Sequence, residues 1–232
     1  MRRAAEIGAT VAREGLEFGV VQREVAMGGQ MLRLQGLKGV YDEVFLPLYG
    51  NHQAGNAVCA LAAVETLTAG DDPLDADLVR NAFAQVSSPG RLEVVRRGPT
   101  VLVDAAHNPG AAQSVVETLE ESFGFDRLIG VVAVMADKDV AGVLELLEPV
   151  MAEIVVTRNS SPRSMEVDDL VSLAEDIFGA ERVHAAARLD DAIDLAIGLT
   201  EDAGEFSGSG VLITGSVVTA GDARTLLRAE AE

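Results

Sequence analysis

Six short apolar runs follow one another along the chain after residue 90, and stretches with helical periodicity separate most of them. The runs are apolar at nearly every position, a pattern typical of strands buried on both faces of a sheet. Their alternation with helices predicts an α/β fold with a Rossmann-like, mostly parallel, doubly wound sheet and right-handed crossovers. The expected strands are 92–95, 101–105, 128–135, 154–157, 183–185 and 211–214, the first two forming a hairpin, and the expected helices are 109–122, 140–151, 167–178, 190–200 and 217–229.

The hydrophobic pattern before residue 90 is different. Three short β-rich runs come first, at 17–25, 31–37 and 43–48, with a hairpin signal at Gly28-Gly29 between the first two. An apolar helix from residue 51 to about 67 follows, and then a helix over 75–86 with Asp75 as its acidic cap. Three strands and two helices make a poor domain on their own, so we expect the closing part of a larger domain.

A cluster of small residues, SSPG at 87–90, separates the two patterns and is typical of a hinge. The charge changes there as well. Residues 1–90 carry 7 basic and 11 acidic side chains, a net −4, whereas residues 91–232 carry 11 and 26, a net −15. We therefore expect two domains, 1–88 and 89–232.

The whole chain of 232 residues has 37 acidic and 18 basic side chains, a net charge of −19. Nucleic acids are bound by dense Lys and Arg, so this balance excludes a nucleic-acid-binding protein. No run approaches the ~18 consecutive apolar residues of a membrane helix, and the first residues lack the apolar region of a signal peptide. We expect a cytoplasmic protein without a membrane partner, and a monomer, because the surplus negative charge disfavours self-association.

Cysteine and lysine are both scarce. The one cysteine, Cys59, lies in the apolar run 57–61 and is expected to be a buried, inert thiol. One cysteine and three histidines offer no zinc-binding spacing, so we predict no metal ligands. The two lysines, Lys38 and Lys138, stand outside any G-K-[ST] sequence, which excludes a complete P-loop site within this chain.

Ligands of a doubly wound sheet bind beyond the carboxyl ends of its strands, so the residues after each strand are the candidates for chemistry. Asp104 lies at the end of the strand 101–105, and His107 follows it. Asn108 can cap the next helix and Pro109 can start it. An acid, an imidazole and free backbone N–H groups indicate an anion or ribose site. A capped helix with a hydrogen-bonded aspartate explains the same residues equally well.

Three other positions have the same double interpretation. Ser216 follows the last strand in a T-G-S turn, and Lys138 stands between two aspartates after the strand 128–135. Arg91 follows the hinge, where its planar guanidinium could hold a phosphate with two hydrogen bonds. The alternatives are a common strand–Gly–Ser turn, a surface ion cluster and an ordinary exposed arginine.

In their order along the chain, these residues resemble folylpolyglutamate synthase and its bifunctional relative dihydrofolate synthase, in the wider Mur ligase superfamily. The strings PGRLE at 89–93, VDAAHNP at 103–109, ADKD at 136–139 and ITGS at 213–216 carry the resemblance. The string LYGNHQ at 48–53, with Asn56-Ala57, is similar to the family's G-x-H-Q-x-x-N-A element.

The resemblance implies an ATP-dependent ligase that uses Mg²⁺ and joins L-glutamate to a folate or dihydropteroate. The folate carboxylate attacks the γ-phosphate of ATP, and the amine of glutamate then displaces phosphate from the acyl phosphate. Residues 1–88 would be the end of the central, ATP-binding domain, and residues 89–232 the Rossmann-like C-terminal domain.

The family's nucleotide contacts carry over to four positions. Asn56 would contact the adenine and His52 would support the nucleotide pocket. Arg91 would contact the ATP phosphates as a catalytic residue. Asp104 would serve the ribose or orient Arg91.

The incoming glutamate has its own expected contacts. His107 and Ser216 would receive it, together with Asn108, and Lys138 would assist. We count His107 and Lys138 with Arg91 as the expected catalytic residues.

The chain also departs from the family, because its sequence lacks the P-loop, the family's upstream metal ligands and most of the folate pocket. We therefore expect a carboxy-terminal portion of such a ligase, inactive by itself. Two alternatives stay open. One is a muramoyl-peptide-type or cyanophycin-type ligase, and the other is a non-catalytic Rossmann-like binding module.

Overall fold

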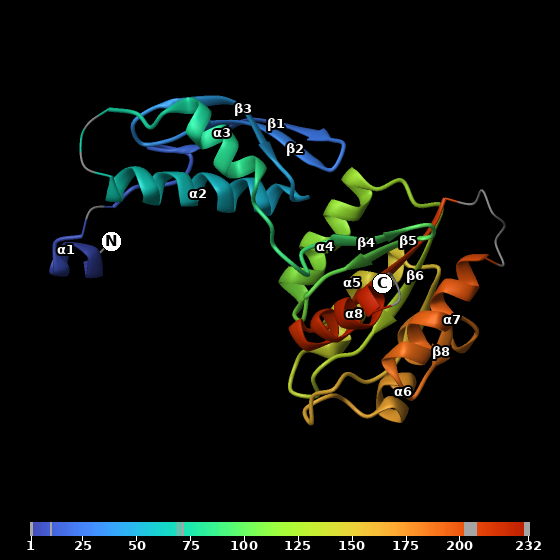
Figure 1. Ribbon diagram of the computed structural model, residues 1–232. Coiled ribbons are helices and arrows are strands. Elements are labelled where there is room, and N and C mark those ends of the chain that lie inside the picture. Colours follow the sequence, from blue (N-terminus) through green and yellow to red (C-terminus); the bar gives the residue numbers. More distant parts are fainter. Residues whose placement is uncertain (1, 10, 69, 71, 202–207, 230–232) are drawn as a thin grey trace. The chain divides into compact units, whose positions relative to one another are not determined.

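The computed structural model describes residues 2–9, 11–68, 70, 72–201 and 208–229 of the chain. The chain divides into two compact units, Met1–Ser87 and Ser88–Glu232. The first unit contains a three-stranded sheet, and the second contains a six-stranded sheet (Figure 1).

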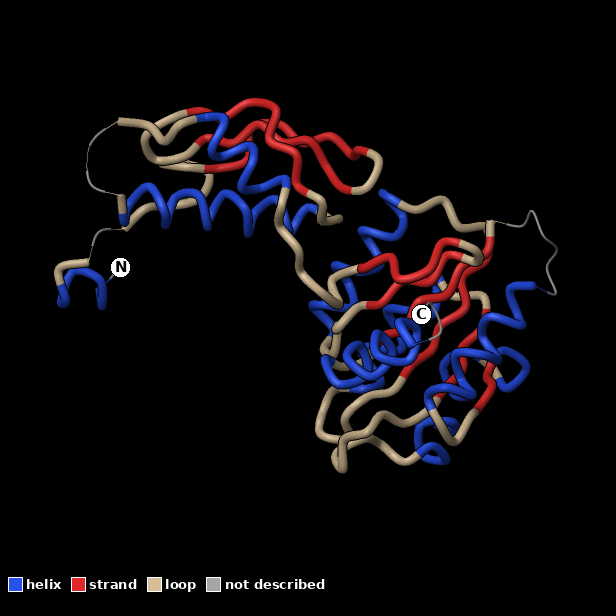
Figure 2. Tube along the Cα trace, viewed as in Figure 1, coloured by secondary structure: helices blue, strands red, loops and turns tan. Residues whose placement is uncertain are grey.

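The sheet of the first unit is antiparallel, in the order β1-β2-β3. Figure 2 draws its strands in red. Strands β1 (Gly19–Ala26) and β2 (Gly29–Gln35) form the predicted hairpin. Gly28 turns it with a φ of 82°, a left-handed conformation that glycine adopts without steric cost. Strand β3 (Val40–Leu46) pairs with β2 and completes the sheet.

Two helices cover one face of this sheet. Helix α2 (Asn51–Leu67) and helix α3 (Ala76–Ala84) share a single apolar core with the strands. Asp75 caps α3 as predicted, because its carboxylate accepts a hydrogen bond from Leu78 N at 2.9 Å. A short helix, α1 (Arg2–Ile7), precedes the sheet.

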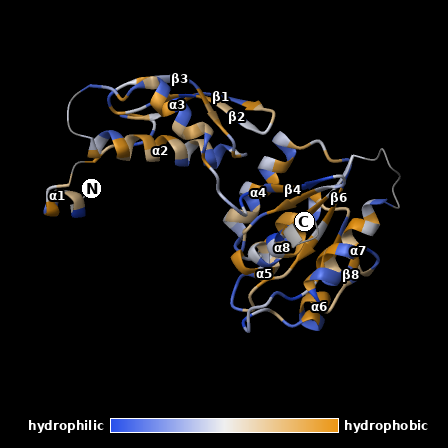
Figure 3. Ribbon diagram, viewed as in Figure 1, coloured by the Kyte–Doolittle hydropathy of each residue, from blue (hydrophilic) through white to orange (hydrophobic). Residues whose placement is uncertain are grey.

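Helix α2 is apolar around much of its circumference (Figure 3). Its buried positions recur with helical spacing and include Ala54, Val58 and Leu61. The prediction that Cys59 is a core thiol is wrong. The thiol is exposed, because its position lies outside the buried stripe of the helix.

The sheet of the second unit has the order β4-β5-β9-β6-β7-β8. All its neighbouring strands are parallel except β4 and β5, which form the predicted antiparallel hairpin. The mostly parallel sheet is therefore confirmed. Its strands are β4 (Glu93–Arg97), β5 (Thr100–Val103), β6 (Arg127–Val132), β7 (Glu153–Val156), β8 (Val183–Ala185) and β9 (Ser209–Thr214).

Helices lie on both faces of this sheet, as a doubly wound fold requires. One core joins α7 and α8 to the valines and isoleucines of β5, β6, β7 and β9. Helix α5 ends at Leu147, earlier than predicted, because Pro149 has no N–H to continue it and a 3₁₀ turn follows. The helices are α4 (Pro109–Ser122), α5 (Val140–Leu147), α6 (Val167–Phe178), α7 (Leu189–Glu201) and α8 (Val217–Ala229).

The strand order reverses next to β5. The chain runs from β6 through β7 to the edge strand β8, and then returns to place β9 between β5 and β6. Backbone hydrogen bonds join the ends of β5 and β9: Asp104 N donates to Ile213 O at 3.0 Å, and Gly215 N donates to Ala106 O at 3.1 Å. Such a reversal creates the crevice in which doubly wound sheets bind ligands.

Candidate functional site

Asp104 lies at this reversal, and only 6% of it is exposed. One carboxylate oxygen accepts a hydrogen bond from Leu92 N at 2.9 Å, and the other accepts one from Ala106 N at 2.7 Å. Burial raises the pKa of Asp104, while the two backbone N–H groups and the nearby charge of Arg91 act in the opposite direction. The side chain therefore fastens the segment around Arg91 to the end of β5.

The backbone on either side of Arg91 is unusual. Gly90 has a φ of 69°, and Leu92 has a φ of 43° although it carries a side chain. Gly90 O also accepts a hydrogen bond from Ala105 N at 2.9 Å. The Arg91 side chain is exposed, and its guanidinium forms no ion pair or hydrogen bond within the described residues. Arg91 is thus an exposed cation on a backbone that hydrogen bonds hold in place.

His107 is half-buried, and its Nδ1 lies 3.0 Å from Ala105 O. A carbonyl oxygen can only accept, so Nδ1 carries a proton and the neutral ring keeps the lone pair of Nε2. Asn108 caps α4 as predicted: its side-chain oxygen accepts a hydrogen bond from Ala111 N at 2.9 Å, and Pro109 is the first helical residue. The side-chain oxygen of Asn108 is thus used within the helix.

Ser216 is only 3% exposed and caps the opposite helix, α8. Its hydroxyl oxygen accepts hydrogen bonds from Thr219 N at 2.9 Å and from Asn159 Nδ2 at 3.2 Å. It also lies 2.8 Å from Thr219 Oγ1. The predicted glutamate-binding hydroxyl is therefore engaged inside the protein.

Lys138 lies on the loop after β6, where its Nζ is 3.9 Å from Asp137 Oδ2. Arg163, from the loop after β7, contacts both oxygens of Asp137 at 2.6 and 2.7 Å. The Arg163 guanidinium lowers the pKa of Asp137, and Lys138 contributes less. Because Arg163 forms the closer ion pair with Asp137, the ammonium group of Lys138 is the less tightly held of the two cations.

Two threonines at this edge were not among the expected site residues. The hydroxyls of Thr157, after β7, and Thr214, the last residue of β9, are fully buried and lack a hydrogen-bonding partner among the residues that the structure describes. Ile213 packs toward α7 and α8, so Thr214 points to the other face of the sheet. A threonine at the end of an otherwise apolar strand is the sequence signal that could have identified both.

The two predicted residues of the first unit share one hollow. His52 and Asn56 stand one turn apart near the start of α2, and both line a pocket of about 450 Å³. Glu14, Gly15 and Cys59 line it too. The amide of Asn56 donates a hydrogen bond to Gln53 Oε1 at 3.2 Å, so its own oxygen still has acceptor capacity.

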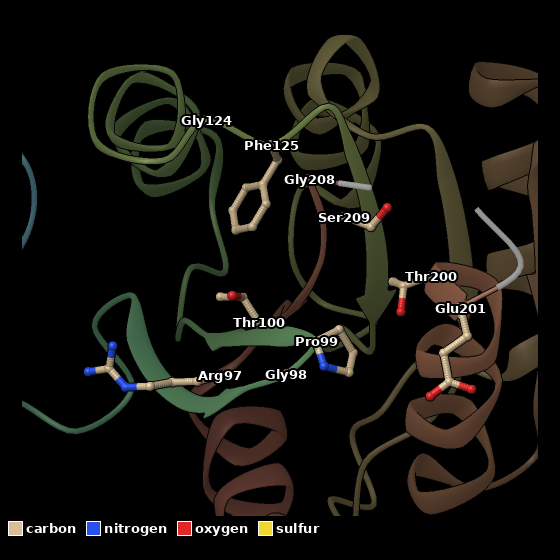
Figure 4. Close-up of a pocket in the computed structure, with 10 residues that line it drawn as sticks. All are labelled: Arg97, Gly98, Pro99, Thr100, Gly124, Phe125, Thr200, Glu201, Gly208 and Ser209. Atoms are coloured by element: carbon tan, nitrogen blue, oxygen red, sulfur yellow. The ribbon is translucent and has the colours of Figure 1, made fainter. Parts of the chain in front are cut away.

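A different pocket, of about 540 Å³, lies at the amino ends of β5 and β9 (Figure 4). Arg97, Thr100 and Phe125 are among its lining residues. It opens on the opposite edge of the sheet from Asp104 and His107 and contains none of the predicted site residues. We assign it no part in the site.

The described residues contain no group of three or more His, Cys, Asp or Glu side chains placed to hold a metal ion. No helix within the described ranges is long and apolar enough to cross a membrane. In the second unit the structure brings Arg91, Asp104, His107 and Ser216 to the joined ends of β5 and β9, with Lys138 on the neighbouring strand's loop.

Residues 90–217 match the family model described as Mur ligase, glutamate ligase domain. The chain is 52% identical over 228 residues to the dihydrofolate synthase/folylpolyglutamate synthase of Mycobacterium tuberculosis, across 94% of this chain and 47% of that protein. The crystal structure of M. tuberculosis folylpolyglutamate synthase complexed with ADP and AMPPCP superimposes with a TM-score of 0.93 at 51% identity, over 97% of this chain and 51% of that one.

A more distant structure shares the same fold. Escherichia coli FolC in complex with DHPP and ADP gives a TM-score of 0.79 at 24% identity, over 99% of this chain and 50% of that one. The chain thus spans about half the length of the relatives that it matches.

Proposed function

This chain belongs to the Mur ligase family, of which it carries the glutamate ligase domain, and we propose that it is the glutamate-receiving part of an ATP-dependent ligase that joins L-glutamate to a folate. One observation carries the proposal. The strand-order reversal brings an exposed arginine, a buried aspartate and a half-buried histidine to one edge of the matched domain. The names of the relatives supply the folate substrate and the dihydrofolate synthase or folylpolyglutamate synthase activity.

The amine of glutamate needs an acceptor for its proton before it can attack an acyl phosphate. The lone pair of His107 Nε2 is such an acceptor, and its tautomer is set by Ala105 O. Lys138 would attract a carboxylate of the amino acid, and the buried hydroxyl of Thr214 is a further polar group at the same edge. Asn108 and Ser216 would act as caps of α4 and α8, whose N-termini favour carboxylates.

Arg91 would bind the phosphates of ATP. Its guanidinium can donate two parallel hydrogen bonds to phosphoryl oxygens and stabilise charge that develops during transfer. Asp104 would keep it in place through Leu92, rather than by contacting the ribose, because the residue is only 6% exposed and each of its carboxylate oxygens accepts a hydrogen bond from a backbone N–H group.

The pocket at the start of α2 would take the adenine. The amide of Asn56 can both donate to and accept from a base edge, and His52 lines the same wall. Binding of ADP and AMPPCP by the M. tuberculosis relative supports ATP as the nucleotide. Mg²⁺ would bring charge neutralisation to the phosphates, but the described residues do not form a site for it, and we assign it no ligand here.

The first unit would be the end of a larger ATP-binding domain. Besides its buried stripe, α2 exposes a second apolar stripe of Ala60, Val64 (47% exposed) and Leu67 (85% exposed). A helix that is apolar on both sides is normally covered on both. With no P-loop in the sequence, we propose that residues 1–232 alone do not turn over ATP. The missing part of the ligase would be supplied in a joined polypeptide. It consists of the part of the M. tuberculosis relative that this chain does not match, followed by residues 1–232.

The nucleotide pocket can be tested through Cys59, the one cysteine of the chain, which lines it. In the joined polypeptide, with its other cysteines replaced, we expect ATP to slow alkylation of Cys59 by N-ethylmaleimide severalfold, because bound adenine would shield the thiol. Mass spectrometry of the labelled peptide measures the rate. The control is the double substitution Cys59→Ala and Ala63→Cys, which moves the thiol one turn along α2 and out of the pocket. The labelling rate of this thiol should be the same with and without ATP. Equal labelling of Cys59 with and without ATP, at a concentration that saturates the enzyme, would place the adenine elsewhere.

The glutamate site can be tested at His107. In the joined polypeptide, His107→Ala is expected to raise the KM for glutamate by about 10-fold or more, with a smaller change in the KM for ATP, because a contact to glutamate alone is lost. The kcat is expected to fall as well, because the acceptor for the amine proton is removed. Glutamate-dependent ADP release at varied glutamate and ATP gives both constants. His184→Ala is the matched control: that imidazole pairs with Glu153 away from the site, at the amino ends of the strands. A raised KM for ATP with an unchanged KM for glutamate would reassign His107.

The folate substrate separates this proposal from a muramoyl-peptide-type or cyanophycin-type ligase. The 52% identity to a protein named for folate chemistry favours the folate. In the same assay, ADP release should depend on dihydropteroate or tetrahydrofolate. A non-catalytic binding module would give no release with any acceptor.

A further inference from the structure

The loop after β7, residues 158–165, is fastened to the last turn of the sheet by one buried asparagine. Asn159 is 4% exposed, and its Nδ2 donates to Ser216 Oγ at 3.2 Å and to Thr219 Oγ1 at 3.0 Å. Its Oδ1 accepts from Ser161 N at 3.0 Å. Both amide hydrogens and the amide oxygen are therefore in use, across a separation of 57 to 60 residues from its two hydroxyl partners.

The hydrogen bonds among these hydroxyls have only one consistent direction. Thr219 Oγ1 lies 2.7 Å from Ala133 O, and a carbonyl can only accept, so the threonine donates there. The hydroxyl oxygen of Ser216 already accepts two hydrogen bonds, so Ser216 donates to Thr219. Each hydroxyl oxygen is then saturated, with two bonds accepted and one donated. The network has no place for a ligand, but it fixes the geometry of the turn.

The same loop also reaches the loop after β6. Ala136 N donates to Arg163 O at 3.0 Å, and the Arg163 guanidinium holds Asp137, the neighbour of Lys138. Asn159 thus connects two parts of the site, the Gly215-Ser216 turn beside Ala106 and the loop that carries Lys138.

We propose that Asn159 is a positioning residue for the glutamate site, one that acts through Ser216 and the loop 158–165 without touching the substrate. The inference rests on the proposed function. Only an amide offers two donors and one acceptor at these points. A carboxylate of the same shape would set its lone pairs against the oxygens of Ser216 and Thr219, and an alanine would leave both oxygens short of a donor.

The test is the KM for L-glutamate in the joined polypeptide, measured with the KM for ATP and the melting temperature. Asn159→Asp is expected to raise the glutamate KM by at least ~5-fold, the effect of about one lost hydrogen bond, while the ATP KM stays within twofold. Thr219→Val removes one partner of the same amide and should change the constants in the same direction. Ser160→Ala is the matched control, because it removes only the side-chain hydrogen bond from the same loop to Asp222, keeps the one from the backbone N–H, and should leave both constants unchanged.

The outcomes separate the inference from the proposed function. If Asn159→Asp does not fold, Thr219→Val alone decides the question. A folded variant whose glutamate KM equals that of the unsubstituted protein would overturn the inference and leave the proposed function standing. An equal proportional increase in the KM for glutamate and the KM for ATP would also overturn it, since general destabilisation has that effect. If the unsubstituted joined polypeptide releases no glutamate-dependent ADP, the proposed function falls, and the inference with it.

Discussion

Replacing Arg91 with alanine is expected to lower the kcat of the joined polypeptide by at least ~10-fold, with little change in its stability. The guanidinium is exposed and has no ion-pair or hydrogen-bond partner in the described part of the chain, so its removal breaks no internal contact. Its expected role is to stabilise charge on the phosphates during transfer, an effect that appears in kcat rather than in folding. Steady-state ADP release at saturating substrates measures it.

Arg97→Ala is the matched control for this change. Arg97 is an exposed arginine and the last residue of β4, the short strand that follows Arg91, and it lines the pocket at the opposite edge of the sheet. It should leave kcat unchanged. A kcat/KM for Arg91→Ala equal to that of the unsubstituted enzyme would remove Arg91 from the site.

Replacing Asp104 with alanine is expected to damage both folding and activity. The buried N–H groups of Leu92 and Ala106 would lose their acceptor, at a cost of about 2–4 kcal/mol in the free energy of unfolding. Leu92 would also lose the bond that holds its left-handed backbone, so Arg91 would be displaced and kcat should fall at least as far as in Arg91→Ala. Urea unfolding of residues 1–232 measures the first effect, and ADP release by the joined polypeptide measures the second.

The pH dependence of this loss has a definite sign. Because burial raises the pKa of Asp104, the folded protein holds that proton more tightly than the unfolded chain, whose aspartates titrate near 3.9. The stabilising contribution of Asp104 to the free energy of unfolding is therefore complete below the pKa of the unfolded chain. It declines as the pH rises through the raised pKa of the folded protein. The stability difference between the unsubstituted chain and Asp104→Ala should be larger under acid conditions than at pH 7.

The control is Asp194→Ala, which changes an exposed aspartate on α7 and should lower neither the free energy of unfolding nor kcat. An Asp104→Ala variant as stable and as active as the unsubstituted protein would contradict the anchoring role.

Local patterns in the sequence predicted most of the fold. Strands buried on both faces have a continuous apolar signal, and caps such as Asn108 and Asp75 depend on residues only three positions away. Helix α5 ended earlier than its periodicity indicated because the proline at 149 overrides hydrophobic spacing. Cys59 was misplaced because an apolar run in a helix does not reveal which of its residues face the core.

The site was harder to predict because its side chains are defined by distant partners. The sequence pointed to Ser216, but its hydroxyl is turned inward by Asn159, a residue 57 positions away that carries no local signal. Asp104 was predicted to serve the ribose or to orient Arg91, and the structure adds that it is buried and that each of its oxygens accepts a hydrogen bond from a backbone N–H group. Contacts of this kind depend on the strand order, which no window of sequence contains.

The central claim, that this chain receives glutamate in an ATP-dependent folate ligase, is tested most directly by product analysis of the joined polypeptide. Purified protein would be given ATP, Mg²⁺, tetrahydrofolate or dihydropteroate, and isotopically labelled L-glutamate, and the products separated by mass. We predict a product heavier by one glutamate residue, formed with one ADP, and absent when residues 1–232 are supplied alone or when any substrate is left out. A joined polypeptide that is folded and binds ATP, yet transfers no glutamate to either acceptor, would contradict the claim.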